Sequence, residues 1–252
     1  NLVSDVRLKR YIRDYFEDIK GEEIFISNKA KDAKERNKQI QDLKKGHLDL
    51  IDVRLFGAVT AEEDRGGHFT GPVQFNWGYS LHPVEIVDSS TITSSFSGGQ
   101  GIGKDYRLYY SLIAFSGSVN ANAAEETNLT EEDLKLFDEA MLNSIPLART
   151  RTKIGQYPRL YLRIELKGKD KFLKDLRSMV EVTSQNPNIV QNLRLIRNPE
   201  DYELNINPLI EYLNQNKELI SCIHYWKDEQ ISIPDFDKIF IQDDWKKPLS
   251  LK

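Results

Sequence analysis

Apolar residues recur at intervals of three and four in residues 4–19, which predicts an amphipathic helix with one buried face. Ser4 can cap this helix, because its hydroxyl can accept a hydrogen bond from a free backbone N–H, and Gly21 can stop it. The apolar face comprises Leu8, Ile12, Tyr15, Phe16 and Ile19. The opposite side carries Arg7, Lys9, Arg10 and Arg13.

A second helical pattern occupies residues 130–145. Asn128 or Thr130 can cap it, and the acidic residues 131–133 suit the positive end of a helix dipole. Pro146 ends it, because proline cannot continue a helix. The predicted apolar face comprises Leu134, Phe137, Met141, Leu142 and Ile145.

Four segments are rich in β-branched and aromatic residues and are predicted to be strands: residues 50–59, 73–87, 106–121 and 157–166. With the two helices they approximate the order helix, strand, strand, helix, strand. One more strand before Ser4 would complete a β-α-β-β-α-β plan, the ferredoxin-like arrangement that RNA-recognition modules use. The sequence therefore predicts an α+β fold.

Polar segments interrupt this plan. Residues 29–45 are dense in charge and nearly free of large apolar side chains, which predicts a solvated helical or mobile insertion that adds little to a core. Residues 88–105 are rich in Ser, Thr and Gly and too long for a tight turn, which is typical of a functional loop. Further along, we predict a helix at 169–182, a strand at 202–206, a helix at 208–216 and a strand at 219–226.

Composition narrows the class of protein. The 252 residues suit one large domain, and 39% hydrophobic residues can form a real core. Apolar stretches fall far short of the roughly 20 residues that a membrane-spanning helix needs. No secretory signal is visible, and the lone Cys222 excludes an internal disulfide, so we predict a cytoplasmic protein without a membrane partner. The sequence begins at Asn1 rather than Met, so we expect the natural N-terminus upstream.

Charge is unevenly distributed behind a formal total of −4. Residues 147–177 hold ten Lys and Arg against three acids, a local charge of +7. Residues 200–244 hold eleven acids against three Lys, a local charge of −8. A polyanion can therefore bind the basic segment despite the negative total.

Motifs of catalysis are weak. Gly98 to Lys104 fits the G-x-x-x-x-G-K formula of a phosphate-binding loop, but Asp105 stands where a Ser or Thr should ligate magnesium. The segment before the match is polar and the segment after it is strand-like, so a glycine-rich hairpin tip is the better interpretation.

Metal and nucleophile motifs are also weak. The four histidines are scattered, without the short paired spacings of zinc sites. Cys222 and His224 lie in an apolar stretch, which favours a buried thiol beside a packed histidine. Asp52 precedes a strand-like run together with Arg54 and could be a general base or a metal ligand, but a strand-edge carboxylate paired with an arginine is the simpler interpretation.

Two basic clusters suit phosphate binding. The first is the cationic side of the 4–19 helix, where the helix end offers free N–H groups and the side chains supply charge. An ordinary solvated face would look the same. The second is a loop that contains Gly155, which allows close backbone approach. Its cations are Arg149, Arg151, Lys153 and Arg159. Together they indicate contacts to a nucleic-acid backbone rather than to bases.

Four motifs occur in order: LVSDVRLKRYIRDYF (2–16), DVRLFGAV (52–59), FTGPVQFNWGYSLHPVE (69–85) and NLTEEDLKLFDEAMLN (128–143). They resemble the repeated backbone subunit of the type I-B CRISPR Cascade complex, the seventh Cas family. The resemblance covers most of residues 2–166 and continues more loosely to about residue 227. Type I-C backbone subunits are similar in sequence plan.

The resemblance implies a right-hand shape: a ferredoxin-like, RNA-recognition-motif-like palm with inserted finger loops and a thumb hairpin. The palm would comprise residues 1–28, 50–87 and 106–167, with a charged finger-type insertion at 29–49. The thumb hairpin would be 88–105, and residues 168–252 a C-terminal α/β extension that completes the palm. Family members ordinarily begin with a strand and an asparagine- and glycine-rich loop before this helix. We expect neither in the residues given, and we expect the intact protein to have the strand.

Site roles follow from the same resemblance. Ser4, Lys9 and Arg13 match the palm helix that contacts RNA backbone, with Arg7 and Arg10 beside them. Arg149, Arg151 and Lys153 match the loop near the RNA channel. In the thumb, Phe96, Gln100 and Ile102 would wedge between bases, and Lys104 lies beside them.

The resemblance thus implies a scaffold without enzymatic activity, cofactor or metal, which binds CRISPR RNA and presents it to target DNA. Its partners would be CRISPR RNA, other copies of itself in a helical filament, other Cascade subunits and target DNA. One alternative is a metal-dependent RNA endonuclease like the type III backbone proteins, with Asp5 or Asp52 as the candidate residue. A free-standing single-strand binder is another.

Overall fold

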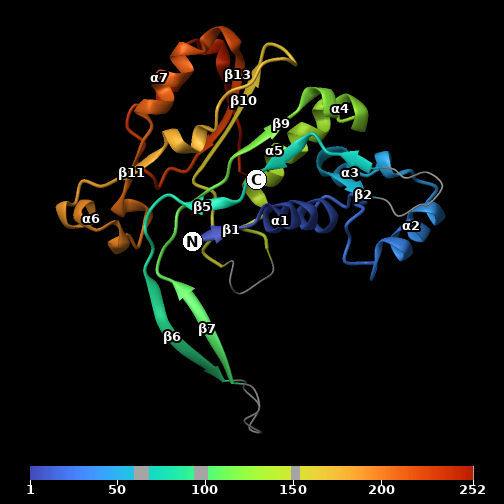
Figure 1. Ribbon diagram of the computed structural model, residues 1–252, viewed down its shortest axis with the longest axis horizontal. Coiled ribbons are helices and arrows are strands. Elements are labelled where there is room, and N and C mark those ends of the chain that lie inside the picture. The colour runs from blue at the N-terminus through green and yellow to red at the C-terminus, as the bar shows by residue number, and fades with distance from the viewer. Residues whose placement is uncertain (60–67, 94–101, 149–153, 252) are drawn as a thin grey trace.

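Helix α1 (Asp5–Asp18) forms as its periodicity predicts. In the computed structural model, which describes residues 1–59, 68–93, 102–148 and 154–251, Ser4 accepts a hydrogen bond from the Arg7 N–H at 3.3 Å. Leu8, Ile12 and Phe16 are buried. The helix runs beside α5 (Glu131–Asn143), as Figure 1 shows.

Thr130 and Asp133 close a capping box at the start of α5, each side chain bonding the other's backbone N–H. Tyr15 of α1 donates its hydroxyl to Glu139 of α5 at 2.7 Å. Both helices enclose one apolar cluster, here called the N-terminal core. It comprises Leu8, Ile12, Tyr15, Phe16, Ile24, Ile51, Leu55, Phe56, Val73, Phe137 and Ala140.

The strand predicted at residues 50–59 is wrong for most of its length. Residues Ile51–Phe56 form helix α3, and only Gly57–Val59 form a strand, β2, which pairs with β3 (His68–Thr70). Helical spacing turns Ile51 and Leu55 together into the N-terminal core. Gly57 ends the helix at a φ of +75°, and a Cβ there would lie 2.1 Å from the Phe69 carbonyl oxygen. Glycine is therefore required at this position.

The long strands predicted at 73–87 and 106–121 are broken into shorter ones. β4 (Val73–Phe75) pairs with β9 (Gly117–Val119), while β1 (Leu2–Val3), β5 (Gly78–Ser80) and β8 (Ile113–Ala114) form an antiparallel sheet in the order β1-β5-β8. A strand does therefore precede α1, contrary to expectation. Helix α4 (Ala121–Thr127) takes the end of the second segment.

A two-stranded hairpin extends away from the rest of the molecule (Figure 1). It consists of β6 (Ile86–Thr93) and β7 (Ile102–Leu108), which pair antiparallel from Ile86↔Leu108 to Thr93↔Ile102, with a shift of register between Val87 and Ser90. Since a strand and not a helix follows the G-x-x-x-x-G-K match, the interpretation of that match as part of a hairpin is confirmed.

The charged segment 29–45 contributes more to a core than predicted. It contains α2 (Ala33–Asp42), where Ile40 is 2% exposed and packs with Phe25, Leu50 and Val53. Arg36 is also buried, and its guanidinium donates to the Ile24 carbonyl oxygen at 2.6 and 2.9 Å. Sequence periodicity does not reveal this buried face, because it contains only one large apolar residue and one arginine.

The C-terminal part is organised by β10 (Leu160–Leu166), which pairs antiparallel with β13 (Ile220–Lys227). β14 (Lys246–Pro248) adds to β13 in parallel, and α7 (Asn207–Gln215) covers the apolar cluster beneath. That cluster is the C-terminal core. It comprises Leu112, Ile189, Ile196, Tyr202, Leu204, Ile206, Leu209, Ile210, Leu213, Ile220, Ile223, Ile231, Ile233, Ile239, Phe240 and Trp245.

The helix predicted at 169–182 is wrong. Residues Leu176–Met179 form one 3-10 turn, η3, and Glu181–Thr183 form strand β11, which pairs with β12 (Glu203–Asn205). Val180 and Val182 pack against the C-terminal core, and their β-branched side chains suit the extended backbone.

The remaining elements are short. They are α6 (Pro187–Gln191) and the 3-10 turns η1 (His47–Asp49), η4 (Leu193–Leu195), η5 (Pro199–Asp201), η6 (Lys217–Leu219), η7 (Phe236–Ile239) and η8 (Asp243–Trp245). The predicted mixture of helices and sheets is confirmed. None of the helices in the described part of the chain has the length and apolar composition to cross a bilayer.

Candidate nucleic-acid interface

The start of α1 presents one exposed cation. Pairing of Leu2 with Tyr79 and of Val3 with Gly78 fixes where the helix begins. Ser4 is engaged as the N-cap, and Arg7 one turn later is exposed, with its guanidinium 5.9 Å from the centre of the Tyr11 ring. Arg7 can therefore reach a phosphate from the surface of the molecule.

Lys9 and Arg13 are much less accessible than a helical wheel suggests. Their side chains are 12% and 11% exposed, and both cations lie over the Phe56 ring, at 5.6 and 5.1 Å. Lys9 lies 3.5 Å from Asp5 and donates to Gln74 at 3.3 Å. Burial lowers the pKa of Arg13, against the opposing effect of its carboxylate neighbour.

That neighbour is Asp52, a buried carboxylate that is 1% exposed. It accepts hydrogen bonds from the backbone N–H groups of Phe25 (2.6 Å) and Ile26 (3.0 Å) and from Nε of Arg13 (3.0 Å). Asp52 thus ties α1, α3 and the segment around Phe25 together. The predicted pairing with an arginine is confirmed, but Asp52 lies on helix α3 and not at a strand edge. Arg54 forms a bidentate pair with Asp133, at 2.8 and 2.6 Å.

Arg10 is also held within the molecule. Its guanidinium pairs with Asp14 at 2.7 Å and donates to the Ile26 carbonyl oxygen at 2.6 Å. The segment around Phe25 and Ile26 and helix α3 therefore cover the side of α1 that the sequence indicated as solvated. A helical wheel contains no information about such covering segments.

Several predicted site residues lie outside the described part of the chain: Phe96, Gln100, Arg149, Arg151 and Lys153. Ile102 and Lys104 belong to β7, opposite Thr93 and Thr91 at the end of the hairpin remote from the body. Their assignment to a thumb stays a prediction.

Two arginine–aromatic pairs that the sequence analysis missed lie on the surface. Tyr79, 47% exposed, has the Arg177 guanidinium 5.2 Å from its ring centre, and Arg177 also donates to the Trp77 carbonyl oxygen at 2.8 Å. Tyr109, 52% exposed, has Arg197 at 4.3 Å. Flat exposed rings beside guanidinium groups suit stacking with nucleobases.

These pairs lie at informative places. Tyr79 lies on β5, directly opposite Leu2, and Leu2 is two residues before the helix cap Ser4. Tyr109 follows β7 at the root of the hairpin, where Arg197 also pairs with Glu85. In the sequence, the aromatic run FNWGYS was the available signal for the first pair, but Arg177 and Arg197 come together with these rings only in the fold.

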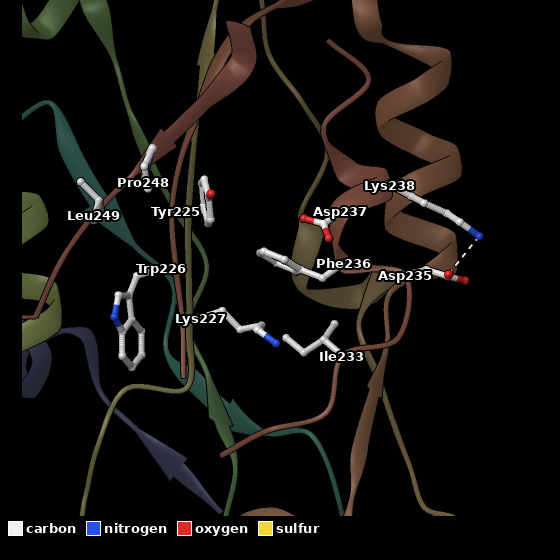
Figure 2. Close-up of a pocket in the computed structure, with 10 residues that line it drawn as sticks. All are labelled: Tyr225, Trp226, Lys227, Ile233, Asp235, Phe236, Asp237, Lys238, Pro248 and Leu249. Carbon is white, nitrogen blue, oxygen red and sulfur yellow. Dashed lines mark ion pairs between the residues drawn. The ribbon is translucent and has the colours of Figure 1, made fainter. Parts of the chain in front are cut away.

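The C-terminal part has a groove of about 760 Å³ beside β13 and η7 (Figure 2). Lys227 lies over Phe236 at 5.9 Å, and Lys238 pairs with Asp235 at 2.9 Å. Two lysines and two aspartates line the groove, which therefore does not favour a polyanion. Its lining comprises Tyr225, Trp226, Lys227, Ile233, Asp235, Phe236, Asp237, Lys238, Pro248 and Leu249.

A second hollow, of about 600 Å³, is acidic. Glu200, Asp201, Glu203 and Glu229 line it together with Ser184, Gln185, Asn186, Ile189, Tyr202, Gln230, Ile231 and Ser232. It holds four carboxylates and no cation, which matches the strongly negative charge of residues 200–244. This surface suits a basic protein partner.

Side chains of the kinds that ligate metals come together once in the described ranges, on β10 and β13. Glu165, Cys222 and His224 lie there, far along the chain from α1. The prediction of a buried thiol beside His224 is confirmed, since Cys222 is 7% exposed and its Sγ lies 3.5 Å from Nε2 of His224. The participation of Glu165 was not foreseen.

The fold and surface define a class of protein: an α+β chain with a projecting hairpin, an exposed arginine at a helix start, and arginine–aromatic pairs. Solved structures share this fold. A chain titled "CRISPR RNA-guided surveillance complex" aligns with all of this chain and 82% of its own length, with a TM-score of 0.56 and 14% identity. Another, "CRISPR RNA-guided surveillance complex, pre-nicking", aligns with 93% of this chain and 87% of its own, with a TM-score of 0.53 and 12% identity.

Sequence comparison identifies the family. The family described as "CRISPR-associated protein Cas7" matches residues 1–207, so the chain belongs to the Cas7 family. A curated relative, "CRISPR-associated protein Cas7" of Haloferax volcanii, is 27% identical over 290 aligned positions, covering 99% of this chain and 83% of the relative.

Proposed function

We propose that this chain is a guide-RNA-binding backbone subunit of a type I Cascade surveillance complex, of subtype I-B, in the cytoplasm. Copies lie head to tail along CRISPR RNA and leave its bases available for pairing with target DNA. Membership of the Cas7 family carries the proposal, supported by a fold similar over the whole chain to a chain of an RNA-guided surveillance complex.

The parts of the molecule take the following roles. Residues 1–28, 50–87 and 106–167 act as an RNA-recognition-motif-like palm, and the β6–β7 hairpin acts as the thumb. Projection of the hairpin from the body supports this assignment, because a wedge between bases must reach beyond the surface that holds the backbone. Residues 29–49 belong to a finger-type insertion, and residues 168–252 extend the palm.

Arg7 makes the most direct phosphate contact of the α1 cations, because it is exposed whereas Lys9, Arg10 and Arg13 are partly buried. Tyr79 with Arg177, and Tyr109 with Arg197, supply stacking surfaces that tolerate any base. Lys9 and Arg13 hold the palm helix in place through their internal pairs and add positive potential beneath the RNA.

Contact between copies uses charge. The acidic hollow lined by Glu200, Asp201, Glu203 and Glu229 receives the basic segment 147–177 of the next copy. Neutralising the four acids together is expected to weaken assembly on a guide without changing the RNA affinity of a single copy. Normal assembly by this variant would contradict the contact.

The chain works without cleaving RNA. Asp52, one candidate of the nuclease alternative, is buried and accepts three hydrogen bonds, which leaves it poorly placed to activate water. Asp5, the other candidate, pairs with Lys9. Metal-dependent cleavage of bound target RNA, lost in Asp5→Asn at unchanged stability, would favour the nuclease.

Purification of the protein from its natural host, followed by sequencing of the bound nucleic acid, tests the proposal. Repeat-spacer RNA is the expected result. Heterogeneous RNA bound to isolated copies would instead support a free-standing single-strand binder.

A further inference from the structure

Three side chains of different chemistry converge on one face of the β10–β13 pair. Glu165 of β10 lies directly opposite Cys222 of β13 in the antiparallel register. His224 follows two residues after Cys222, and alternate residues of a strand point to the same face. Carboxylate, thiol and imidazole are therefore brought together by strand pairing, although Glu165 is remote from the other two in sequence.

The distances among the three donor atoms are close to those of a tetrahedral zinc site. Sγ of Cys222 lies 3.5 Å from Oε2 of Glu165 and 3.5 Å from Nε2 of His224, and those two atoms are 3.4 Å apart. Zinc bonds of about 2.3 Å to sulfur and about 2.0–2.1 Å to nitrogen and oxygen, at tetrahedral angles, require separations of about 3.3–3.6 Å. The three separations therefore match those of a tetrahedral zinc site.

The other nitrogen of His224 faces a second carboxylate. Nδ1 lies 3.9 Å from Oδ2 of Asp138, on α5. Asp138 is buried and fixed by Arg163 at 2.8 and 2.6 Å and by the Tyr161 hydroxyl at 2.7 Å. A carboxylate behind a histidine is the usual arrangement around zinc ligands, since it orients the ring and raises its basicity.

Exposure of the three side chains provides an entry path. Cys222 is 7% exposed at the floor, whereas the side chains of His224 and Glu165 are 21% and 49% exposed. Without a metal, burial and the neighbouring Glu165 raise the pKa of Cys222 to about 11, opposed by the nearby cations Lys247 and Arg163.

We propose that Glu165, Cys222 and His224 form a zinc-binding site, with the fourth position of the tetrahedron open to solvent. On binding, the Cys222 thiol loses its proton to solvent and sulfur coordinates as thiolate, while Oε2 of Glu165 and neutral Nε2 of His224 complete the set. The bound ion links β10 to β13 within the sheet that organises the C-terminal core.

Zinc titration of the chelator-treated full chain, with metal content measured by mass spectrometry, tests the proposal. One zinc per chain is expected, with the melting temperature rising as zinc is added. Cobalt in place of zinc should give a sulfur-to-metal charge-transfer band. Glu165→Gln, at a half-exposed position, should weaken zinc binding at least about tenfold, by comparison with the 10–100-fold effects of outer-shell changes.

Matched controls separate this site from adventitious binding. Cys222→Ser should abolish the cobalt band, while Glu132→Gln, an exposed carboxylate on α5, and His47→Gln, a histidine outside the cluster, should retain zinc. Absence of zinc uptake, uptake undiminished in Glu165→Gln and Cys222→Ser, or binding of copper or nickel without zinc would each overturn the assignment.

Discussion

Replacement of Asp52 by Asn should destabilise the protein severely. The carboxylate is 1% exposed and accepts three hydrogen bonds, one of them from a guanidinium that is itself 11% exposed. Asn removes the charge and turns an NH₂ group toward groups that only donate, which leaves the Arg13 cation buried without a counter-ion. Breaking one partner of such a pair costs about 3–5 kcal/mol, a large fraction of the roughly 5–15 kcal/mol stability of a typical domain.

Urea unfolding followed by circular dichroism measures this loss, and Asp14→Asn is the matched control. Asp14 also pairs with an arginine of α1, but its side chain is 39% exposed. Exposed pairs at this helical spacing contribute only about 0.3–0.5 kcal/mol. If Asp52→Asn shifts the unfolding midpoint no more than Asp14→Asn does, the assignment of Asp52 as a structural carboxylate is refuted.

The remaining predictions concern acid stability and RNA binding. Burial tends to raise the pKa of Asp133, but the hydrogen bonds from Arg54 prevail and the pKa is lowered overall, so its stabilisation is present above the ordinary pKa of Asp and lost as pH falls through the lowered value. Unfolding curves at pH 7 and in acid should show that acidification lowers the free energy of unfolding less for Asp133→Asn than for the natural chain. An equal decrease in both proteins would contradict the pairing. Arg7→Glu should weaken RNA binding equally for all sequences and reduce the salt slope by about 1, whereas Lys135→Glu should not; a sequence-selective loss would argue against phosphate contact. Tyr109→Ala should cost about 1–3 kcal/mol of RNA affinity, as for loss of one stacked base; unchanged affinity in a filter-binding assay would remove this ring from the interface.

Local sequence signals predicted the elements that depend on local chemistry. The Ser4 and Thr130 caps and the apolar periodicity of α1 and α5 are properties of contiguous residues, and both helices form where expected. The strand prediction failed at residues 51–56 because the sequence IDVRLF alternates apolar and charged positions, as a half-buried strand does, although the segment forms a helix. A helix places Ile51 and Leu55 on one side, where both pack into the N-terminal core, and this packing favours the helix over a strand.

The candidate site was predicted less well than the fold, because it depends on long-range packing. Lys9 and Arg13 looked solvated until α3 and the segment around Phe25 were placed against them. Similarly, the Cys222–His224 pair is visible in sequence, but only the register of β10 against β13 brings Glu165 to it. In these cases the sequence shows the chemical type of each side chain but not which residues lie beside it in the fold.

Native mass spectrometry of complexes assembled on CRISPR RNAs of increasing spacer length tests whether this chain acts as a head-to-tail backbone subunit. A backbone subunit that lies head to tail along the guide adds copies in regular steps as the spacer grows. The number of bound copies is therefore expected to rise stepwise with spacer length. A constant number of copies at every guide length would contradict it.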